Sequence, residues 1–245
     1  IPPWKTPAFW RSALRKSAEQ LSAPRKGLVF FAGDLGFNRI AGYSHNLRQL
    51  AFALFCDPHT TKKSACTPVA YDRRCDCECR HDMPQNCSLW KPGVSIRTHS
   101  SRYSAELEEH TFCLAFPGDG WSSRVLDAVI HGCIPVIVQD ESEMFFEGAF
   151  SAAGLGVDYA NFSLRLAEAE LPTLVDVLER VPTERVKELR MAALSVRDYF
   201  VYKDMYNPDV EDRKQLLETG ARGRDAFWLI ARSLLVRARA VLPAV

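Results

Sequence analysis

Short apolar runs alternate along the chain with stretches in which apolar residues recur every three or four positions. The first pattern is typical of buried strands and the second of amphipathic helices. Strands are expected at "GLVFFAG", "VSIRT", "FCLAF" and "IPVIV", which are residues 27–33, 94–98, 112–116 and 134–138. Helices are expected between the last two of these strands and over residues 8–21, 43–55, 102–109, 171–181, 183–202 and 223–242. This alternation predicts an α/β fold with a mostly parallel, Rossmann-like sheet flanked by helices.

Residues 56–92 interrupt this pattern. They hold four prolines, most of the eight cysteines and few large apolar side chains, so we expect an insertion there rather than part of the core. The chain has no internal repeat and no low-complexity linker. The sequence therefore predicts one domain over residues 1–245, with a Cys-rich insertion at about residues 56–92.

The charge of the whole chain is nearly balanced, with 31 lysines and arginines against 30 aspartates and glutamates. This balance gives no bias toward nucleic acid, so a bound anion has to be held by a local site. No run is long enough for a transmembrane helix, and the first residues lack the order of a signal peptide. Because the sequence begins without Met, we expect a mature product or a fragment, attached to a membrane only through a segment outside it. Sequons at Asn86 and Asn161 favour a lumenal protein.

A polar turn, "PGDGWSSR", separates the last two apolar runs. In an open parallel sheet such a turn lies at the carboxyl ends of the strands, where ligands bind. Gly118 and Gly120 allow the main chain to come close to a ligand. Ser122 or Ser123 can cap the helix that follows, whose free N–H groups and dipole favour an anion such as phosphate.

Arg124 stands in the first turn of this expected helix, where a cation is unfavourable to the helix dipole unless an anion compensates it. Asp127 lies three residues further on the same helical face, so its carboxylate can accept hydrogen bonds from ribose hydroxyls while Arg124 holds phosphate. The alternative is an ordinary surface ion pair beside a simple turn. The turn, the cap, Arg124 and Asp127 coincide where α/β sheets bind nucleotides, which favours a nucleotide site.

The segment "FCLAFPGDGWSSRVLDAVIHGCIPVIVQD" resembles the signature of the exostosin-like glycosyltransferases, glycosyltransferase family 47. That signature runs FCL-P-G-S-R-acid-A-GCIPV-D. Four further segments agree in order with the family: "IPP" at the start, "LVFFAG", Arg48 in "NLRQL", and "DAFWLIARSL" near the end. The resemblance covers most of the chain except residues 56–92.

The resemblance implies the C-terminal half of a GT-B type enzyme, in which two Rossmann-like domains face each other across a cleft. This half binds the nucleotide-sugar donor, and an N-terminal domain that is missing here forms most of the acceptor side. The reaction implied is transfer of a sugar from a UDP-sugar to a glycan or glycoprotein acceptor with inversion of configuration. The location implied is the Golgi lumen, as part of a type II membrane protein.

The resemblance also implies roles for individual residues. Departing UDP places negative charge on the diphosphate, and fixed hydrogen-bond donors stabilise that charge. The expected donors are Arg48, Arg124 and the N–H groups of residues 118–123, which would replace a metal ion, so no metal or other cofactor is expected. Asp127 matches the residue that binds the uridine ribose, although many members have Glu there. Asp140 is the candidate that faces the sugar, and no residue is assigned as the base.

The cysteines and histidines allow other interpretations. The Cys-x-Cys-x-Cys spacing of Cys75, Cys77 and Cys79 suits a structural zinc site poorly. Disulfides within an exposed loop are expected instead, with their pairing left open. Cys113 and Cys133 are expected to be buried thiols.

Three more residues have a functional and a structural interpretation. His131 is expected at a helix end, where a structural role is favoured. His45, near Arg48, is a weaker candidate for contact with phosphate or sugar. Trp121 can stack on a base or sugar ring, or only anchor its loop.

Two functions from other classes compete with the transferase. A non-catalytic Rossmann-like scaffold protein would use the Cys-rich loop for interactions. A flavin or dinucleotide-binding domain is disfavoured, because no G-x-G-x-x-G motif follows the first expected strand.

Overall fold

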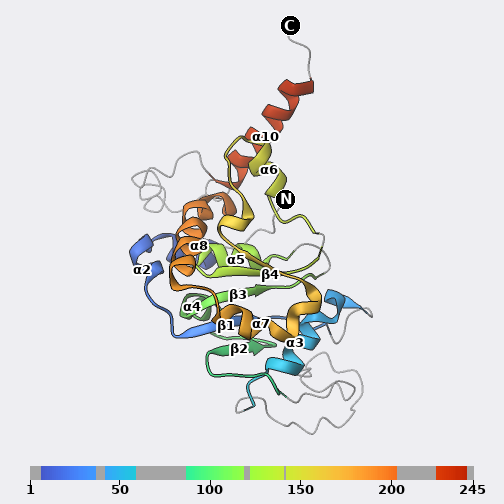
Figure 1. The fold of residues 1–245 in the computed structure, drawn as a ribbon. Helices are drawn as coiled ribbons and strands as arrows, with labels where there is room; N and C mark the ends of the chain where they lie inside the picture. The colour runs from blue at the N-terminus through green and yellow to red at the C-terminus, as the bar shows by residue number, and fades with distance from the viewer. Residues whose placement is uncertain are drawn as a thin grey trace.

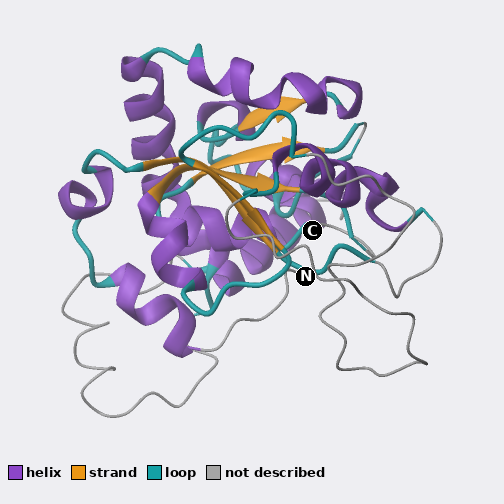
Figure 2. Cartoon of the chain, turned by 90° about the horizontal axis from the view of Figure 1, so that it is seen from below, coloured by secondary structure: helices purple, strands orange, loops and turns teal. Residues whose placement is uncertain are grey.

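A parallel sheet between layers of helices forms the body of the protein. The computed structural model describes residues 7–36, 42–58, 87–118, 122–140, 142–202 and 225–241. Within these residues, five strands form one sheet in the order β2-β1-β3-β4-β5, and each neighbouring pair is parallel (Figure 1). Figure 2 shows helices on both sides of the sheet. The expected α/β fold is therefore confirmed.

The elements have the following bounds. The strands are β1 (Gly27–Ala32), β2 (Val94–Arg97), β3 (His110–Ala115), β4 (Ile134–Val138) and β5 (Leu164–Leu166). The α-helices are α1 (Pro7–Leu14), α2 (Ala18–Ser22), α3 (Leu47–Phe55), α4 (Tyr103–Glu109), α5 (Arg124–Ile130), α6 (Glu147–Ala152), α7 (Leu174–Glu179), α8 (Thr183–Val196) and α10 (Ala226–Val241). The 3₁₀ turns are η1 (Tyr43–Asn46), η2 (Tyr159–Asn161), η3 (Glu168–Thr173) and η4 (Arg197–Phe200).

The sheet is apolar on both faces because helices cover both. All five residues of β4 are buried, as a central parallel strand requires. Along β1 the side chains alternate between the two faces. Val29 and Phe31 pack with α3 and α7, whereas Phe30 and Ala32 pack toward α4 and α5. The core therefore consists of two layers, with the sheet between them.

Several expected helices begin or end differently in the structure. The helix expected over residues 171–181 is α-helical only in α7, after the 3₁₀ turn η3, and the helix expected over residues 183–202 ends at Val196, where η4 follows. The helix expected over residues 8–21 is interrupted at Ser17, which starts α2 instead. The Ser17 side chain accepts from the N–H of Gln20, and the Gln20 side chain accepts from the N–H of Ser17, so this capping box interrupts the helix. The helix expected over residues 43–55 begins only at Leu47, because the backbone is left-handed over residues 44–46. The elements β5 and α6 were not predicted.

A disulfide joins the two ends of the Cys-rich insertion. Cys56, just after α3, is bonded to Cys87, with their Cα atoms 4.9 Å apart. Residues 59–86, which include Cys75, Cys77, Cys79 and the Asn86 sequon, lie outside the described residues. The second sequon residue, Asn161, is exposed at the end of η2.

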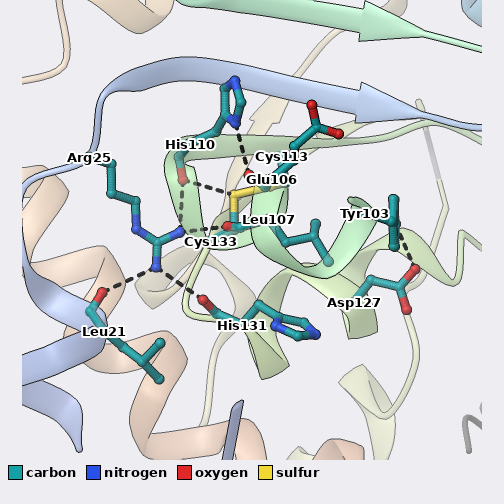
Figure 3. Close-up of a disulfide and its surroundings, with 10 residues drawn as sticks. All are labelled: Leu21, Arg25, Tyr103, Glu106, Leu107, His110, Cys113, Asp127, His131 and Cys133. Carbon is teal, nitrogen blue, oxygen red and sulfur yellow. Dashed lines mark hydrogen bonds between the residues drawn. A yellow bond between two sulfur atoms is a disulfide. The ribbon is translucent and has the colours of Figure 1, made fainter. Parts of the chain in front are cut away.

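Cys113 and Cys133 form a buried disulfide, so the expectation of two thiols was wrong (Figure 3). Both side chains are at most 2% exposed, as expected. Cys113 lies in β3 and pairs in register with Pro135, and Cys133 immediately precedes β4. Because these strands are neighbours, the two Cα atoms come to 5.9 Å, within the range that a disulfide spans.

Arg25 joins four segments near this disulfide (Figure 3). Its guanidinium donates hydrogen bonds to the carbonyl oxygens of Leu107 and His110 at 2.7 and 2.8 Å. It also donates to those of Leu21 and His131 at 3.1 and 3.0 Å. The ends of α2, α4 and α5 and the start of β3 are thus held by one side chain.

The environment of Arg25 is unfavourable to its charge. Burial lowers the pKa of Arg25 to about 9, with the charge of Arg190 acting in the same direction and that of Glu108 opposing both. Arg25 is still a cation at neutral pH, so its four hydrogen bonds are charge-assisted.

We predict that Arg25→Met lowers the free energy of unfolding by about 3 kcal/mol, because four carbonyl groups lose a charged donor. Urea unfolding followed by circular dichroism measures this change. The control is Arg185→Met on α8, an exposed arginine whose replacement should cost less than about 1 kcal/mol. Equal destabilisation by the two substitutions would contradict the role given to Arg25.

Candidate functional site

The strand order places a topological switch point at the carboxyl ends of β1 and β3. The chain leaves β1 toward β2 on one side and then crosses to β3 on the other side. The connections that follow β1 and β3 therefore diverge, and open α/β sheets bind ligands at such a point. The sequence predicted a site after β3, and the strand order shows that the end of β1 lies beside it.

Two arginines expected to bind phosphate both lie at this switch point. Arg124 opens α5, after β3, yet a Cβ added to Gly33, after β1, would lie 2.7 Å from its Nη2. Conversely, Arg48 comes from α3, after β1, and a Cβ added to Gly118, after β3, would lie 3.2 Å from its Nη2. Each guanidinium therefore lies against the loop of the opposite strand, and the two glycines make room for them.

Arg48 is held rigidly and is only 7% exposed. Its Nη1 donates to the carbonyl oxygen of Asp34 and to the hydroxyl of Tyr43, both at 2.8 Å. Its guanidinium carbon lies 5.0 Å from the ring centroid of Tyr43 and 5.6 Å from that of Phe31. These cation–π contacts and hydrogen bonds fix the orientation of the cation.

Arg124, Tyr103 and Asp127 form a hydrogen-bonded group. Nη1 of Arg124 donates to the Tyr103 hydroxyl at 2.7 Å and to Oδ2 of Asp127 at 3.1 Å. The Tyr103 hydroxyl in turn donates to the same Oδ2 at 2.8 Å, and the ring centroid of Tyr103 lies 5.0 Å from the Arg124 guanidinium carbon. The ion pair between Arg124 and Asp127, which the sequence offered as the alternative to a nucleotide site, is thus present, although it is largely buried and not on the surface. Tyr103 from α4 is a third member that the sequence did not predict.

Burial and charge act in opposite directions on the cation of this group. Burial lowers the pKa of Arg124, but the electrostatic interactions and hydrogen bonds with Tyr103 and Asp127 outweigh it, so the pKa of Arg124 is raised. Burial, with the charge of Asp127 acting in the same direction, raises the pKa of Tyr103 well above its ordinary value. The hydroxyl of Tyr103 therefore keeps its proton, and Arg124 keeps its charge, at any physiological pH.

Asp127 has a different setting from the one expected of a ribose ligand. Its side chain is 0% exposed, and the contacts described above orient Arg124. Its contact with ribose stays a prediction.

The expected serine cap of α5 is absent. Ser123 occupies the cap position with helical backbone angles, and no side chain there accepts a hydrogen bond from the helix. Ser122 is buried, and its hydroxyl has no hydrogen-bond partner among the described residues. Gly120 and Trp121 lie outside the described residues. A residue that caps a helix with its side chain has extended backbone angles, and Ser123 has helical ones. The expectation that Ser122 or Ser123 caps α5 was therefore wrong.

A second polar cluster lies beyond β4 and β5. Nδ1 of His45 lies 2.8 Å from Oε1 of Glu168. The same Oε1 accepts from the N–H of Asp140 at 3.2 Å, and Oδ1 of Asp140 accepts from the N–H of Glu168 at 3.1 Å. His45 and Asp140 were expected separately from the sequence, but Glu168 was not, because the three-residue strand before it is too short to recognise. The acidic run "AEAE" after "LRL" was the available signal.

His131 has the structural position expected of it. It caps the C-terminal end of α5, is 1% exposed, and places Nδ1 3.2 Å from Oε1 of Glu108. Glu108 also pairs with Lys16. The pKa of Glu108 is lowered, because the hydrogen bonds and charges of His131 and Lys16 outweigh the effect of burial.

The described part of the chain has neither a metal-binding cluster nor a membrane-spanning helix. It contains no group of three His, Cys, Asp or Glu side chains that could hold a metal ion. It also contains no helix that is long and apolar enough to cross a membrane.

Comparison with known proteins gives a family match and several relatives. The family described as "Exostosin GT47 domain" matches residues 3–181, which is more than half of the chain. The chain is 29% identical over 153 residues to "Probable glucuronosyltransferase GUT1" of Oryza sativa subsp. japonica, covering 57% of this chain and 35% of that protein. It is 31% identical over 137 residues to "Probable beta-1,4-xylosyltransferase IRX10" of Arabidopsis thaliana, covering 56% of this chain and 28% of that protein.

A third relative has the highest identity of these three. It is "Probable arabinosyltransferase ARAD1" of Arabidopsis thaliana, 34% identical over 116 residues, which cover 46% of this chain and 24% of that protein. The matched part of the chain thus spans between 24% and 35% of the length of these relatives.

We predict that Tyr103→Phe lowers the free energy of unfolding by about 1–3 kcal/mol, because buried Asp127 loses a donor and Arg124 loses an acceptor. The matched control is Tyr202→Phe. Burial raises the pKa of Tyr202 to about 12, with the charge of Asp225 acting in the same direction. Its buried hydroxyl has no hydrogen-bond partner in the described part of the chain. Chemical denaturation of both variants measures the difference, and a change as small in Tyr103→Phe as in the control would contradict the proposed coupling.

Proposed function

Because this chain belongs to the exostosin GT47 family, we propose that it is the nucleotide-sugar-binding part of a glycosyltransferase. The enzyme would transfer a sugar from a UDP-sugar to a glycan or glycoprotein acceptor, with inversion of configuration. The observation that supports this proposal most is that the guanidinium groups of Arg48 and Arg124 both lie at the carboxyl ends of β1 and β3. Two fixed cations at this edge suit a diphosphate.

Arg48 and Arg124 would act on the leaving group. As the bond between the anomeric carbon and the diphosphate breaks, negative charge grows on the phosphate oxygens. Donors that are already oriented stabilise this charge without reorganisation. The N–H groups around Gly118, Gly120, Ser122 and Ser123 would add to the same effect. With two guanidinium groups in place, we predict transfer without a metal ion or other cofactor.

Asp127 would bind the uridine ribose, as the family pattern implies. Because the side chain is 0% exposed in this structure, ribose can reach it only if Tyr103 or the first turn of α5 shifts. Binding would then exchange the Tyr103 hydrogen bond for ribose hydroxyls. The catalytic base is not assigned, and Asp140 remains the candidate that faces the sugar.

The rest of the enzyme would lie outside this chain. The relatives are much longer than the matched part, which supports a GT-B enzyme with a separate N-terminal domain on the acceptor side. We place the whole protein in the Golgi lumen, with any membrane anchor outside this sequence. The names of the relatives make UDP-glucuronic acid, UDP-xylose and UDP-arabinose the donors to test.

A scaffold protein without catalysis is not favoured. The three relatives described above all carry transferase names. The Cys-rich loop on which the scaffold role depended lies mostly outside the described residues.

We predict that the chain binds UDP and that Arg124→Ala weakens binding by about 10- to 100-fold, the effect of losing charge-assisted hydrogen bonds to a phosphate. Isothermal titration calorimetry measures the affinity, and circular dichroism verifies that each variant is folded. Arg185→Ala is the control, because Arg185 is exposed on α8 and bonds to Ala160 and Glu188. Arg124→Lys should recover part of the affinity through its charge. Absence of UDP binding, or unchanged binding by folded Arg124→Ala, would refute the proposed function.

A further inference from the structure

The cluster of His45, Asp140 and Glu168 brings together three separate segments of the chain. Asp140 follows β4, Glu168 begins η3 after β5, and His45 lies in η1, between β1 and α3. The contact between His45 and Glu168 therefore carries η1 across the carboxyl ends of β3 and β4. The cluster lies at the same edge of the sheet as Arg48 and Arg124.

The cluster is well fixed and accessible. Both carboxylates accept backbone N–H groups from each other's residues, so neither can rotate freely. The side chains of His45 and Glu168 are 58% and 21% exposed, and Asp140 is exposed. Each carboxylate has about four lone-pair sites, and the bonds above use only some of them. The cluster can therefore accept further hydrogen bonds from a ligand.

Two neighbouring polar groups are buried without hydrogen-bond partners among the described residues. One is the hydroxyl of Ser44, which is 2% exposed and adjoins His45. The other is Oε1 of Gln139, which adjoins Asp140. Buried polar atoms are nearly always bonded, so these two atoms, each in the residue next in sequence to a member of the cluster, leave hydrogen-bonding capacity in two of the segments that form it.

The distance between the cluster and the Gly118 loop, against which Arg48 lies, suits a sugar. Neighbouring parallel strands lie about 4.8 Å apart, and Asp140 and Glu168 follow the first and second strands beyond β3. They are therefore about 5–10 Å along the sheet edge from the Gly118 loop, which is about the reach of one sugar ring from a diphosphate. With ribose toward Asp127 and phosphate at the arginines, the sugar is directed to this side.

We propose that His45, Asp140 and Glu168 form the sugar subsite of the donor site and that this subsite selects a neutral sugar over a uronic acid. This inference rests on the proposed function. The carboxylates accept hydrogen bonds from the hydroxyl groups of a neutral sugar, whereas the carboxylate of a uronic acid meets like charge. Arg165, a nearby cation on β5, does not compensate, because its Nη2 donates to both oxygens of Glu147 at 2.9 Å.

Three donors that differ at one position test this inference. UDP-xylose, UDP-glucose and UDP-glucuronic acid carry hydrogen, hydroxymethyl and carboxylate, respectively, on the same ring carbon. Calorimetry at low salt, which limits screening, should give similar affinities for the first two and about tenfold weaker binding of the third. UDP-glucose separates the effect of charge from that of size.

Variants connect the selectivity to the cluster. Glu168→Gln and Asp140→Asn should each leave the affinity for UDP alone unchanged. Each should also reduce the gap, which is the ratio of the affinities for UDP-xylose and UDP-glucuronic acid, at least about threefold, since each removes one like charge. Glu184→Gln, an exposed glutamate on α8 paired with Lys187, should leave the gap unchanged. His45→Gln removes the only imidazole of the cluster, and the gap should persist without it.

The outcomes separate the two proposals. If UDP does not bind, the proposed function fails and this inference fails with it. If UDP binds but UDP-glucuronic acid binds as tightly as UDP-xylose, the nucleotide site stands and the neutral-sugar subsite is refuted. A selectivity that survives both Glu168→Gln and Asp140→Asn would also refute it, because some other group would then reject the carboxylate.

Discussion

Two largely buried guanidinium groups stand at the carboxyl ends of β1 and β3, and much of the surrounding structure is arranged to hold them. Removing such a cation from water is costly unless charges, hydrogen bonds or aromatic rings replace the solvent. Arg48 has two rings, a hydroxyl and a carbonyl oxygen. Arg124 has the hydroxyl and ring of Tyr103 and the carboxylate of Asp127. The presence of two cations held in this way is explained if they face an anionic ligand.

The two ends of the sheet have different tasks. At the amino end, Arg25 and the disulfide between Cys113 and Cys133 tie strands and helices together through groups that are buried. At the carboxyl end, Arg124 and the cluster around Glu168 keep part of their surface exposed. A rigid amino end allows the loops at the other end to be specialised for binding.

Much of the fold could be predicted because apolar runs and helical spacing report burial directly. The strands β1 to β4 were recognised for this reason, and so was the helix that follows the polar turn. The break at Ser17 and the left-handed turn at residues 44–46 were missed, because local hydrogen bonds and tertiary contacts override the spacing there. Of the candidate site, Arg124 was proposed from the polar turn and Arg48 from the family resemblance. Tyr103 and Glu168 were not, because only the folded chain brings distant segments beside them.

The central claim is that Arg48 and Arg124 jointly bind the diphosphate of a UDP-sugar. A crystal structure of the chain with UDP tests it most directly. The account predicts phosphate oxygens within hydrogen-bond distance of both guanidinium groups, between the loops that follow β1 and β3. A diphosphate bound elsewhere, or one that contacts neither arginine, would contradict it.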